Sequence, residues 1–429
     1  MSWRKGGTVV CLCMDGTPYL LFSYLLKKGA LPNFAKLVER GTFLETISSV
    51  PEVSNVAWTT IFTGCNPAEH GIFGFTDLHH YSYKIKFPSF LDVQVPAVWE
   101  RLSENKRRSI IINVPATYPA KPLVGKLVSG FVAIDLKKAC WPKDWADELE
   151  RIGYVIDVDV SEHVGKKEEL IKALEKSIEA RGRVILDLFE REDFDLFWAV
   201  ISETDRLHHF LFDAAMDESH PLHDAFVGIY RKIDELFGEI LKCLDGRATF
   251  FAFSDHGFTN LEREVNINYW LQEKGYLKFE NSLPKSLEDI SADSAAFALD
   301  PARIYLNVKG RFPKGSVEPD EKAYMLGKLI EGLKKIEAQD GRQVISHIFK
   351  GDEIYSGPLI DKAPDLVLIG RKGFDLKSRI SSETLFSKSH FTGMHTRDDA
   401  FFLTSERRDI KQPFEIVQIY SFLAEKLGI

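Results

Sequence analysis

The chain has 429 residues, of which 45% are hydrophobic and 28% charged, a composition typical of a folded globular protein rather than a disordered one. Because this length exceeds the size at which a single hydrophobic core usually stops growing, we expect one large α/β domain with insertions, or two domains. The formal net charge of −8 argues against binding to the nucleic-acid backbone as the main function, so no specific nucleic-acid partner is expected.

The cysteines and the apolar runs predict a cytoplasmic protein. Five cysteines are scattered along the chain, and an odd, scattered set indicates free thiols in a reducing compartment. The apolar stretch over residues 8–14 is shorter than a signal-peptide core with its cleavage site, and no run approaches the roughly 20 apolar residues that cross a bilayer. We therefore expect no membrane partner, and the sequence carries no signature of the oligomeric state.

The first elements predict a buried strand followed by two helices. Residues 9–14 form a continuous apolar run, the pattern of a strand covered on both faces, and a turn begins at Asp15. Helical stretches follow over residues 18–28 and 31–40, and Gly41 ends the second of them.

Ser54 lies where a loop enters a helix over residues 55–63, which Gly64 ends. The N-terminus of a helix favours anions. Further strands are predicted at residues 109–114, 196–201, 248–254 and 365–369. Because the strands alternate with helical segments, we expect a mostly parallel central sheet.

The stretch over residues 261–388 differs in texture from the rest of the chain. It contains a strand at 303–308 and a helix at about 319–335, separated by a turn rich in glycine and proline. We interpret it as an inserted, smaller cap or substrate lobe. Residues 1–260 and 389–429 then make up a metal-binding catalytic α/β core.

Polar side chains of metal-binding or nucleophilic type follow several of the predicted strands. Asp15, Asp205 and the pair Asp255 and His256 come after strands, and Ser54 stands at a helix start. In open α/β sheets, ligands bind at the carboxyl ends of the strands. We therefore expect these side chains to converge, although they are far apart in the sequence.

Two local spacings support this convergence. Asp205 and His209 form a D-x-x-x-H pair, which shares one face if a helix begins there. Adjacent residues on a strand point in opposite directions, so Asp255 and His256 reach one site only if the backbone turns. Gly257 permits such a turn.

A last imidazole comes from His395 in a polar loop, with His390 less clearly placed. The candidate metal ligands are Asp15, Ser54, Asp205, His209, Asp255, His256 and His395. Such a set suits two divalent ions about 3.5 to 4 Å apart. Imidazole and carboxylate donors without thiolates favour zinc, with manganese or iron as alternatives. One ion would then lower the pKa of the Ser54 hydroxyl, and the reaction would pass through a phosphoserine.

Taken singly, these residues have structural interpretations too. Asp15 and Ser54 could cap helices, and His395 could be an ordinary loop histidine. Their occurrence as a set favours a functional role. His208 would point about 100° away from its neighbour on a helix, so we expect it outside the ligand set, and we interpret His70 as structural.

In this order and spacing, the motifs resemble the alkaline phosphatase superfamily, most closely its type I phosphodiesterase and nucleotide pyrophosphatase branch. The segments that carry the resemblance are Met14-Asp15-Gly16, Leu31-Pro32-Asn33, Ser54 through Thr63-Gly64, Asn66-Pro67-x-x-His70-Gly71, Asp205-x-x-x-His209, Asp255-His256-Gly257 and Gly393-x-His395. The resemblance implies an alkaline-phosphatase-like three-layer α/β/α fold. It also implies two zinc ions, one bound by Asp15, Ser54, Asp255 and His256, and the other by Asp205, His209 and His395.

The nucleophile segment both supports and qualifies the resemblance. Ser54 lies nine residues before Thr63, as the nucleophile does in nucleotide pyrophosphatases, which favours it over Ser48 and Ser49. Those enzymes carry a phosphate-binding asparagine three residues after the nucleophile, where this chain has Ala57. Asn55 is the candidate substitute for substrate binding.

The resemblance implies a hydrolase that cleaves phosphodiester or nucleotide pyrophosphate bonds of a small phosphorylated or nucleotide substrate. A preference between diesters and monoesters stays open, because no phosphate-clamping arginine can be assigned. The alternatives are a phosphomonoesterase or phosphomutase of the same superfamily, or a non-catalytic metal-binding protein. A sulfatase is not expected, since the segment after Ser54 lacks the x-Pro-x-Arg motif.

Overall fold

The computed structural model describes residues 7–244 and 248–429, and the chain divides into two compact units. The first takes in residues 1–65, 89–259 and 390–429, and the second residues 66–88 and 260–389. Residues 66–88, which the sequence analysis assigned to the core, therefore pack with the inserted lobe.

Side-chain contacts explain this grouping of residues 66–88. Arg303 donates a hydrogen bond to the backbone oxygen of Thr76 at 2.8 Å. The ring of Tyr83 stacks on Phe312, with centroids 5.6 Å apart, and meets Phe297 edge-on. Such long-range contacts are invisible in local sequence patterns.

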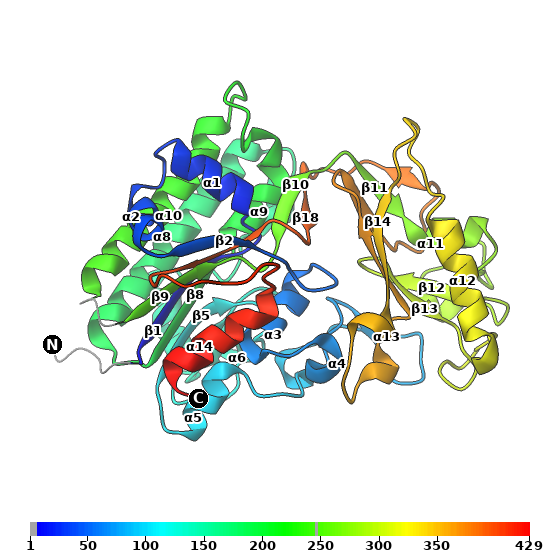
Figure 1. Ribbon diagram of the computed structural model, residues 1–429, viewed down its shortest axis with the longest axis horizontal. Coiled ribbons are helices and arrows are strands. Elements are labelled where there is room, and N and C mark those ends of the chain that lie inside the picture. Colours follow the sequence, from blue (N-terminus) through cyan, green and yellow to red (C-terminus); the bar gives the residue numbers. More distant parts are fainter. Residues whose placement is uncertain (1–6, 245–247) are drawn as a thin grey trace. The chain divides into compact units, whose positions relative to one another are not determined.

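An eight-stranded sheet forms the centre of the first unit (Figure 1). In spatial order its strands are β2 (Thr42–Thr46), β19 (Ala400–Thr404), β9 (Thr249–Phe253), β1 (Val9–Met14), β8 (Leu196–Ile201), β5 (Ser109–Val114), β6 (Gly125–Ser129) and β7 (Cys140–Trp141). The strands from β9 to β6 pair in parallel, whereas the pairs made by β19 and β7 are antiparallel. The predicted mostly parallel sheet is confirmed.

Helices cover both faces of this sheet (Figure 1). One face carries α1 (Tyr19–Lys27), α2 (Pro32–Arg40), α8 (Lys167–Arg191) and α10 (His223–Cys243), and the other α3 (Ser54–Thr63), α5 (Val98–Glu104) and α14 (Ile419–Leu427). Val10, Leu12 and Met14 of β1 join the core under the first set. On the opposite face, the Trp58 ring meets Trp198 edge-on. Both faces of β1 are thus buried, as its continuous apolar run predicts.

The carboxyl ends of β1, β8 and β9 lie at one edge of the sheet, because these strands are adjacent and parallel. Beyond this edge come α9 (Glu203–Leu211) and a two-stranded pair of β10 (Gly257–Asn260) with β18 (Gly393–Thr396). The first unit also contains the short helices α6 (Leu136–Ala139) and α7 (Trp145–Ile152).

The second unit is built on small sheets. The largest has the order β12 (Ala296–Leu299), β13 (Arg303–Leu306), β15 (Leu366–Gly370) and β14 (Ile345–Lys350), and all of its pairs are antiparallel. The others join β16 (Phe374–Lys377), β11 (Arg263–Asn266) and β17 (Phe386–Ser387), and β3 (Asp77–Leu78) with β4 (Ile85–Lys86). Its helices are α4 (Pro67–His70), α11 (Ile267–Glu273), α12 (Lys322–Leu333) and α13 (Gly351–Ile354).

The expectation that residues 365–369 belong to the alternating parallel pattern is wrong. This segment forms β15, which pairs antiparallel with β13 and β14 in the second unit. An apolar run of this length fits a buried strand in either kind of sheet, so the run alone could not decide the partner. In the part of the chain that the structure describes, no helix is long and apolar enough to cross a membrane.

The N-terminus of α2 is held by a buried carboxylate from α10. Pro32 occupies the first turn of α2, where its missing N–H costs nothing. Asp234 is 1% exposed and accepts hydrogen bonds from the backbone nitrogens of Asn33 (3.1 Å) and Phe34 (2.9 Å) and from Asn33 Nδ2 (3.0 Å). The Leu31-Pro32-Asn33 motif therefore holds α2 against α10, which is a structural role.

We expect Asp234→Ala to lower the free energy of unfolding of the first unit by about 2–3 kcal/mol, because it leaves charge-assisted donors unpaired. Urea denaturation followed by circular dichroism measures this change. Glu235→Ala on the exposed side of the same helix is the matched control, with an expected effect within about 0.5 kcal/mol. Equal losses in the two variants would contradict the capping role.

Candidate active site

Ser54 is the first helical residue of α3, and Val53 occupies the N-cap position. The Ser54 hydroxyl is buried and donates a hydrogen bond to Asp15 Oδ1 at 3.2 Å, and it lies 3.1 Å from His256 Nε2. The interpretation of this serine as a helix cap is therefore wrong. Its side chain instead points toward a carboxylate and an imidazole from the sheet edge.

A first cluster forms around His256 at the ends of β1 and β9. Its Nε2 lies 3.6 Å from Asp15 Oδ1 and 3.4 Å from Asp255 Oδ2. All three side chains are at most 1% exposed. Asp255 and His256 thus reach one site, as predicted.

Glycine permits this arrangement by its lack of a side chain. Gly257 has no left-handed φ, and a Cβ there would lie 2.5 Å from Thr396 Oγ1. At Gly16, which has φ +63°, a Cβ would meet the Phe258 ring at 2.8 Å. The backbone bends at Asp255 and His256, as predicted, and close packing explains the glycine that follows them.

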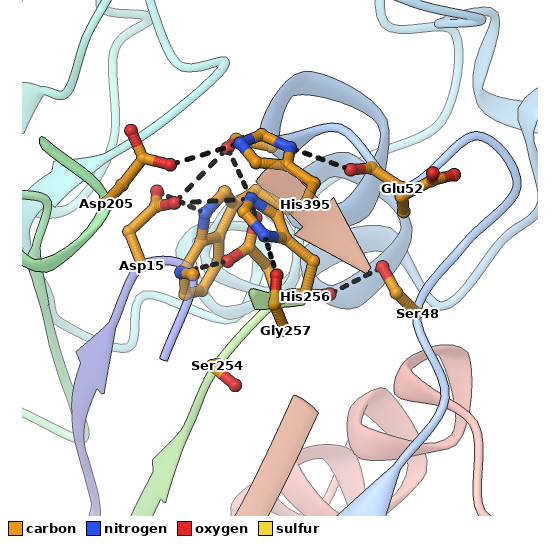
Figure 2. A network of polar contacts seen from close by, with 12 residues as sticks. Asp15, Ser48, Glu52, Asp205, Ser254, His256, Gly257 and His395 are labelled. Carbon is orange, nitrogen blue, oxygen red and sulfur yellow. Dashed lines mark hydrogen bonds and ion pairs between the residues drawn. The ribbon is translucent and has the colours of Figure 1, made fainter. Parts of the chain in front are cut away.

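A second cluster forms where α9 meets β18. Asp205 Oδ1 lies 3.5 Å from His209 Nε2, one helical turn on, and 3.3 Å from His395 Nε2. The two imidazole nitrogens are 3.1 Å apart. Figure 2 shows Asp205 and His395 directed toward each other beside His256. The D-x-x-x-H pair therefore shares one helical face.

Two sets of potential ligand atoms emerge. Those of Asp15, Asp255 and His256 lie within 4.8 Å of one another, and so do those of Asp205, His256 and His395. His256 belongs to both sets, while His209 adjoins the second through its contacts with Asp205 and His395. These sets are consistent with a bimetallic site.

Each of the three carboxylates has one oxygen held by the protein. Asp15 Oδ2 accepts from the Trp58 indole at 2.9 Å, Asp255 Oδ1 from the Gly16 nitrogen at 3.0 Å, and Asp205 Oδ2 from Arg206 Nη1 at 3.2 Å. Asp255 Oδ2 is buried without a hydrogen-bond partner in the described part of the chain. A buried carboxylate oxygen left in this way fits a metal ligand.

Two imidazoles are oriented in the same manner. His256 Nδ1 donates to the backbone oxygen of Gly257 at 3.1 Å, and His395 Nδ1 donates to that of Glu52 at 3.0 Å; Figure 2 draws both contacts. A carbonyl oxygen can only accept, so Nδ1 of each ring carries a proton, and Nε2 has a lone pair that faces the carboxylates when the ring is neutral. This arrangement is typical of metal-binding histidines and suits a divalent cation.

Burial sets the electrostatics of the cluster. Burial, followed by the charges of Asp255 and Asp205, raises the pKa of Asp15 well above its ordinary value, and burial raises the pKa of Asp255 to about 7. Burial would also raise the pKa of Asp205, but His209, His395 and Arg206 hold it well below the ordinary value. A bound cation would offset this crowding of negative charge.

The remaining predicted residues lie outside the ligand clusters. His208 is buried beneath them and donates from Nδ1 to the Gly16 backbone oxygen at 2.9 Å. His390 is exposed, and His70 is buried in the second unit, where burial lowers its pKa to about 3. Asn55 is 7% exposed in the first turn of α3, and its role in substrate binding stays a prediction.

Sequence reasoning missed the groups that orient the ligands. Trp58 follows Ser54 by four residues on α3, so helical periodicity could have placed both on one face. Arg206 adjoins Asp205 in the sequence, but its direction depends on contacts from distant loops. The Glu52 carbonyl has no side-chain signature at all.

Comparisons with known proteins were made for sequence and for structure. The sequence model of the type I phosphodiesterase / nucleotide pyrophosphatase family matches residues 9–398. Comparison with curated protein sequences gives no match.

Solved structures share the fold over nearly the whole chain. Phosphonoacetate hydrolase from Sinorhizobium meliloti 1021 has 15% identity and a TM-score of 0.65, with 98% of this chain and 95% of that chain covered. Murine ectonucleotide pyrophosphatase / phosphodiesterase 5 has 14% identity and a TM-score of 0.57 at the same coverage. An alkaline phosphatase has 13% identity and a TM-score of 0.61, with 100% and 97% covered. The alkaline-phosphatase-like fold is confirmed.

Loss of a carboxylate from either ligand set should remove one ion. We expect Asp15→Asn, Asp205→Asn and His256→Ala each to lose about one equivalent of Zn²⁺ or Mn²⁺, because each change removes one ligand and ligand number sets affinity. Equilibrium dialysis with elemental analysis measures the stoichiometry. His390→Ala is the matched control, and an unchanged metal content in His256→Ala would contradict the assignment of His256 as a ligand.

Proposed function

Because the chain belongs to the type I phosphodiesterase / nucleotide pyrophosphatase family and is a hydrolase acting on phosphate esters, we propose that it cleaves phosphodiester or nucleotide pyrophosphate bonds through a phosphoserine on Ser54. The observation that carries this proposal is the position of the Ser54 hydroxyl. It stands at the N-terminus of α3 and contacts Asp15 and His256, each 1% exposed or less.

The surroundings of Ser54 suit a nucleophile for phosphorus. Ser54 stands at the N-terminus of α3, and the positive end of a helix dipole favours the negative charge of a phosphate. Asp15 Oδ1 accepts the Ser54 proton in a hydrogen bond, so the oxygen is held with its lone pairs oriented.

The reaction that we propose has two balanced displacements. Ser54 Oγ gives up its proton to solvent and forms a bond to phosphorus, while the bond from phosphorus to the leaving oxygen breaks and that oxygen departs with its electron pair and takes up a proton from solvent. Water then attacks phosphorus, the Oγ–P bond breaks, and a proton returns to Ser54. Two bound ions would lower the pKa of the hydroxyl and offset the charge of the transferring group.

We infer zinc as the resident ion, with manganese as the alternative. The donors in the two ligand sets are imidazole nitrogens and carboxylate oxygens, and zinc binds both kinds. No cysteine of the described chain belongs to either set.

We also propose which residue holds a phosphate oxygen of the substrate. Ala57 is completely buried and offers no hydrogen-bonding group where related enzymes hold a phosphate oxygen, so we propose Asn55 for that role. The alternatives are a phosphomonoesterase or a phosphomutase of the same superfamily. They differ from the main proposal in accepting a monoester, or in returning phosphate to a second position of the same molecule.

Removal of the nucleophile should abolish turnover. We expect Ser54→Ala to lower hydrolysis of bis-p-nitrophenyl phosphate by at least about 10³-fold, because the covalent step loses its attacking atom. Ser49→Ala is the matched control, since that hydroxyl bonds to the backbone oxygen of Pro51 instead. Assays with p-nitrophenyl phosphate in parallel separate diester from monoester preference.

Two results of this assay would revise the proposal. Full activity in Ser54→Ala would contradict the phosphoserine route. Turnover of the monoester with none of the diester would favour the phosphomonoesterase alternative.

Metal removal should stop catalysis and leave the protein folded. We expect EDTA to lower diester hydrolysis by at least about 100-fold, since the charge of the transferring group is then uncompensated. Zn²⁺ or Mn²⁺ should restore the rate, and circular dichroism should show a folded apoprotein with a lower thermal midpoint. Complete unfolding on chelation, with no turnover before it, would favour the non-catalytic metal-binding alternative.

A further inference from the structure

Arg206 on α9 lies beside the second ligand set and contacts one of its members. Its Nη1 donates to Asp205 Oδ2 at 3.2 Å, and its side chain is 15% exposed. The remaining oxygen of Asp205, Oδ1, is the one that faces His209 and His395. Arg206 therefore decides which oxygen of Asp205 is turned toward the imidazoles.

The guanidinium is itself fixed on its other edge. Nε and Nη2 donate to the two oxygens of Asp157 at 3.1 and 2.7 Å, a bidentate pair that only the planar fork of arginine can make. The ring of Phe131 lies 4.4 Å from the guanidinium carbon. Two loops distant in sequence thus hold Arg206 in one orientation.

These contacts have a direct consequence for metal ligation. A carboxylate with two accessible oxygens can bind an ion through both, whereas one with an oxygen already bonded offers a single ligand atom. Catalytic metal sites keep a coordination position open for substrate, and structural sites fill all of theirs. Holding Asp205 Oδ2 away from the ligand cluster keeps such a position open.

We propose that Arg206, held by Asp157 and Phe131, is a positioning residue that limits Asp205 to one ligand oxygen and so reserves a place on the second ion for the phosphate group. This inference rests on the proposed function. The inference adds Arg206, a residue outside the predicted ligand set, to the proposed function. The role of Arg206 can be measured through metal binding, without an activity assay.

The test compares Arg206→Gln and Arg206→Lys with Arg191→Gln. Arg191 also pairs with acidic side chains in the first unit, among them Asp187 at 2.8 Å. Its side chain is 41% exposed, so the control loses the same charge at the surface. Co²⁺ is titrated into each apoprotein and followed by its visible absorption spectrum. kcat and KM for bis-p-nitrophenyl phosphate are measured on the Zn²⁺-loaded enzymes.

We expect Arg206→Gln to change the Co²⁺ spectrum and to alter affinity at one of two sites by about 10- to 100-fold, the range typical of groups that hold metal ligands. The kcat of Arg206→Gln should fall together with the Co²⁺ affinity of that site. Arg191→Gln should have the native spectrum, affinity and kcat. Arg206→Lys keeps the charge without the fork, so we expect only partial recovery of the native spectrum.

A second variant, Asp157→Asn, tests the positioning role if Arg206→Gln fails to fold. Asp157→Asn keeps the shape of the side chain and weakens its grip on Arg206, so the spectrum should shift in the same direction by a smaller amount. If Arg206→Gln unfolds and Asp157→Asn has the native spectrum, the positioning role is contradicted.

The outcomes separate this inference from the proposed function. Native Co²⁺ spectra and kcat in a folded Arg206→Gln would overturn the positioning role, and the hydrolase proposal would stand. A native protein that neither binds Co²⁺ nor hydrolyses either ester would overturn the proposed function, and the role of Arg206 with it.

Discussion

Three buried carboxylates, Asp15, Asp205 and Asp255, meet at the carboxyl edge of the central sheet, and their mutual repulsion is the constraint on which the site depends. Each is at most 5% exposed, so water screens their charges poorly. The protein provides hydrogen bonds to one oxygen of each and leaves the other oxygens facing imidazole nitrogens. A pair of divalent cations would neutralise this residual negative charge. Such neutralisation would explain how the three carboxylates can pack so closely.

The strand order of the central sheet brings these three carboxylates close together. Adjacent parallel strands end side by side, so β1, β8 and β9 deliver their following residues to one place without any local sequence signal for proximity. Gly16 and Gly257 then allow the backbone and rings to approach more closely than a Cβ would permit. Asp15, Asp255 and His256 lie in the turns that directly follow the buried strands β1 and β9, and such short connections to rigid elements limit the movement of these side chains.

Relatives with 13–15% identity cover nearly the whole chain in the same fold, so most of the sequence can change while the architecture persists. The polar residues gathered at the sheet edge are the candidates for the chemistry, and the fold alone does not fix the substrate. Residues 66–88, which follow α3 closely in the sequence, belong to the second unit.

The sequence by itself determined the strands that are buried on both faces, because a continuous apolar run reports burial directly: the runs at 9–14, 109–114 and 196–201 match β1, β5 and β8 residue for residue. It also determined the D-x-x-x-H pair, since helical periodicity is local. Only the tertiary structure decided that the strand at 365–369 pairs antiparallel in the lobe, and that Arg206 donates a hydrogen bond to one oxygen of Asp205. Strand partners and side-chain directions depend on contacts between segments far apart in the chain, and no local pattern encodes those.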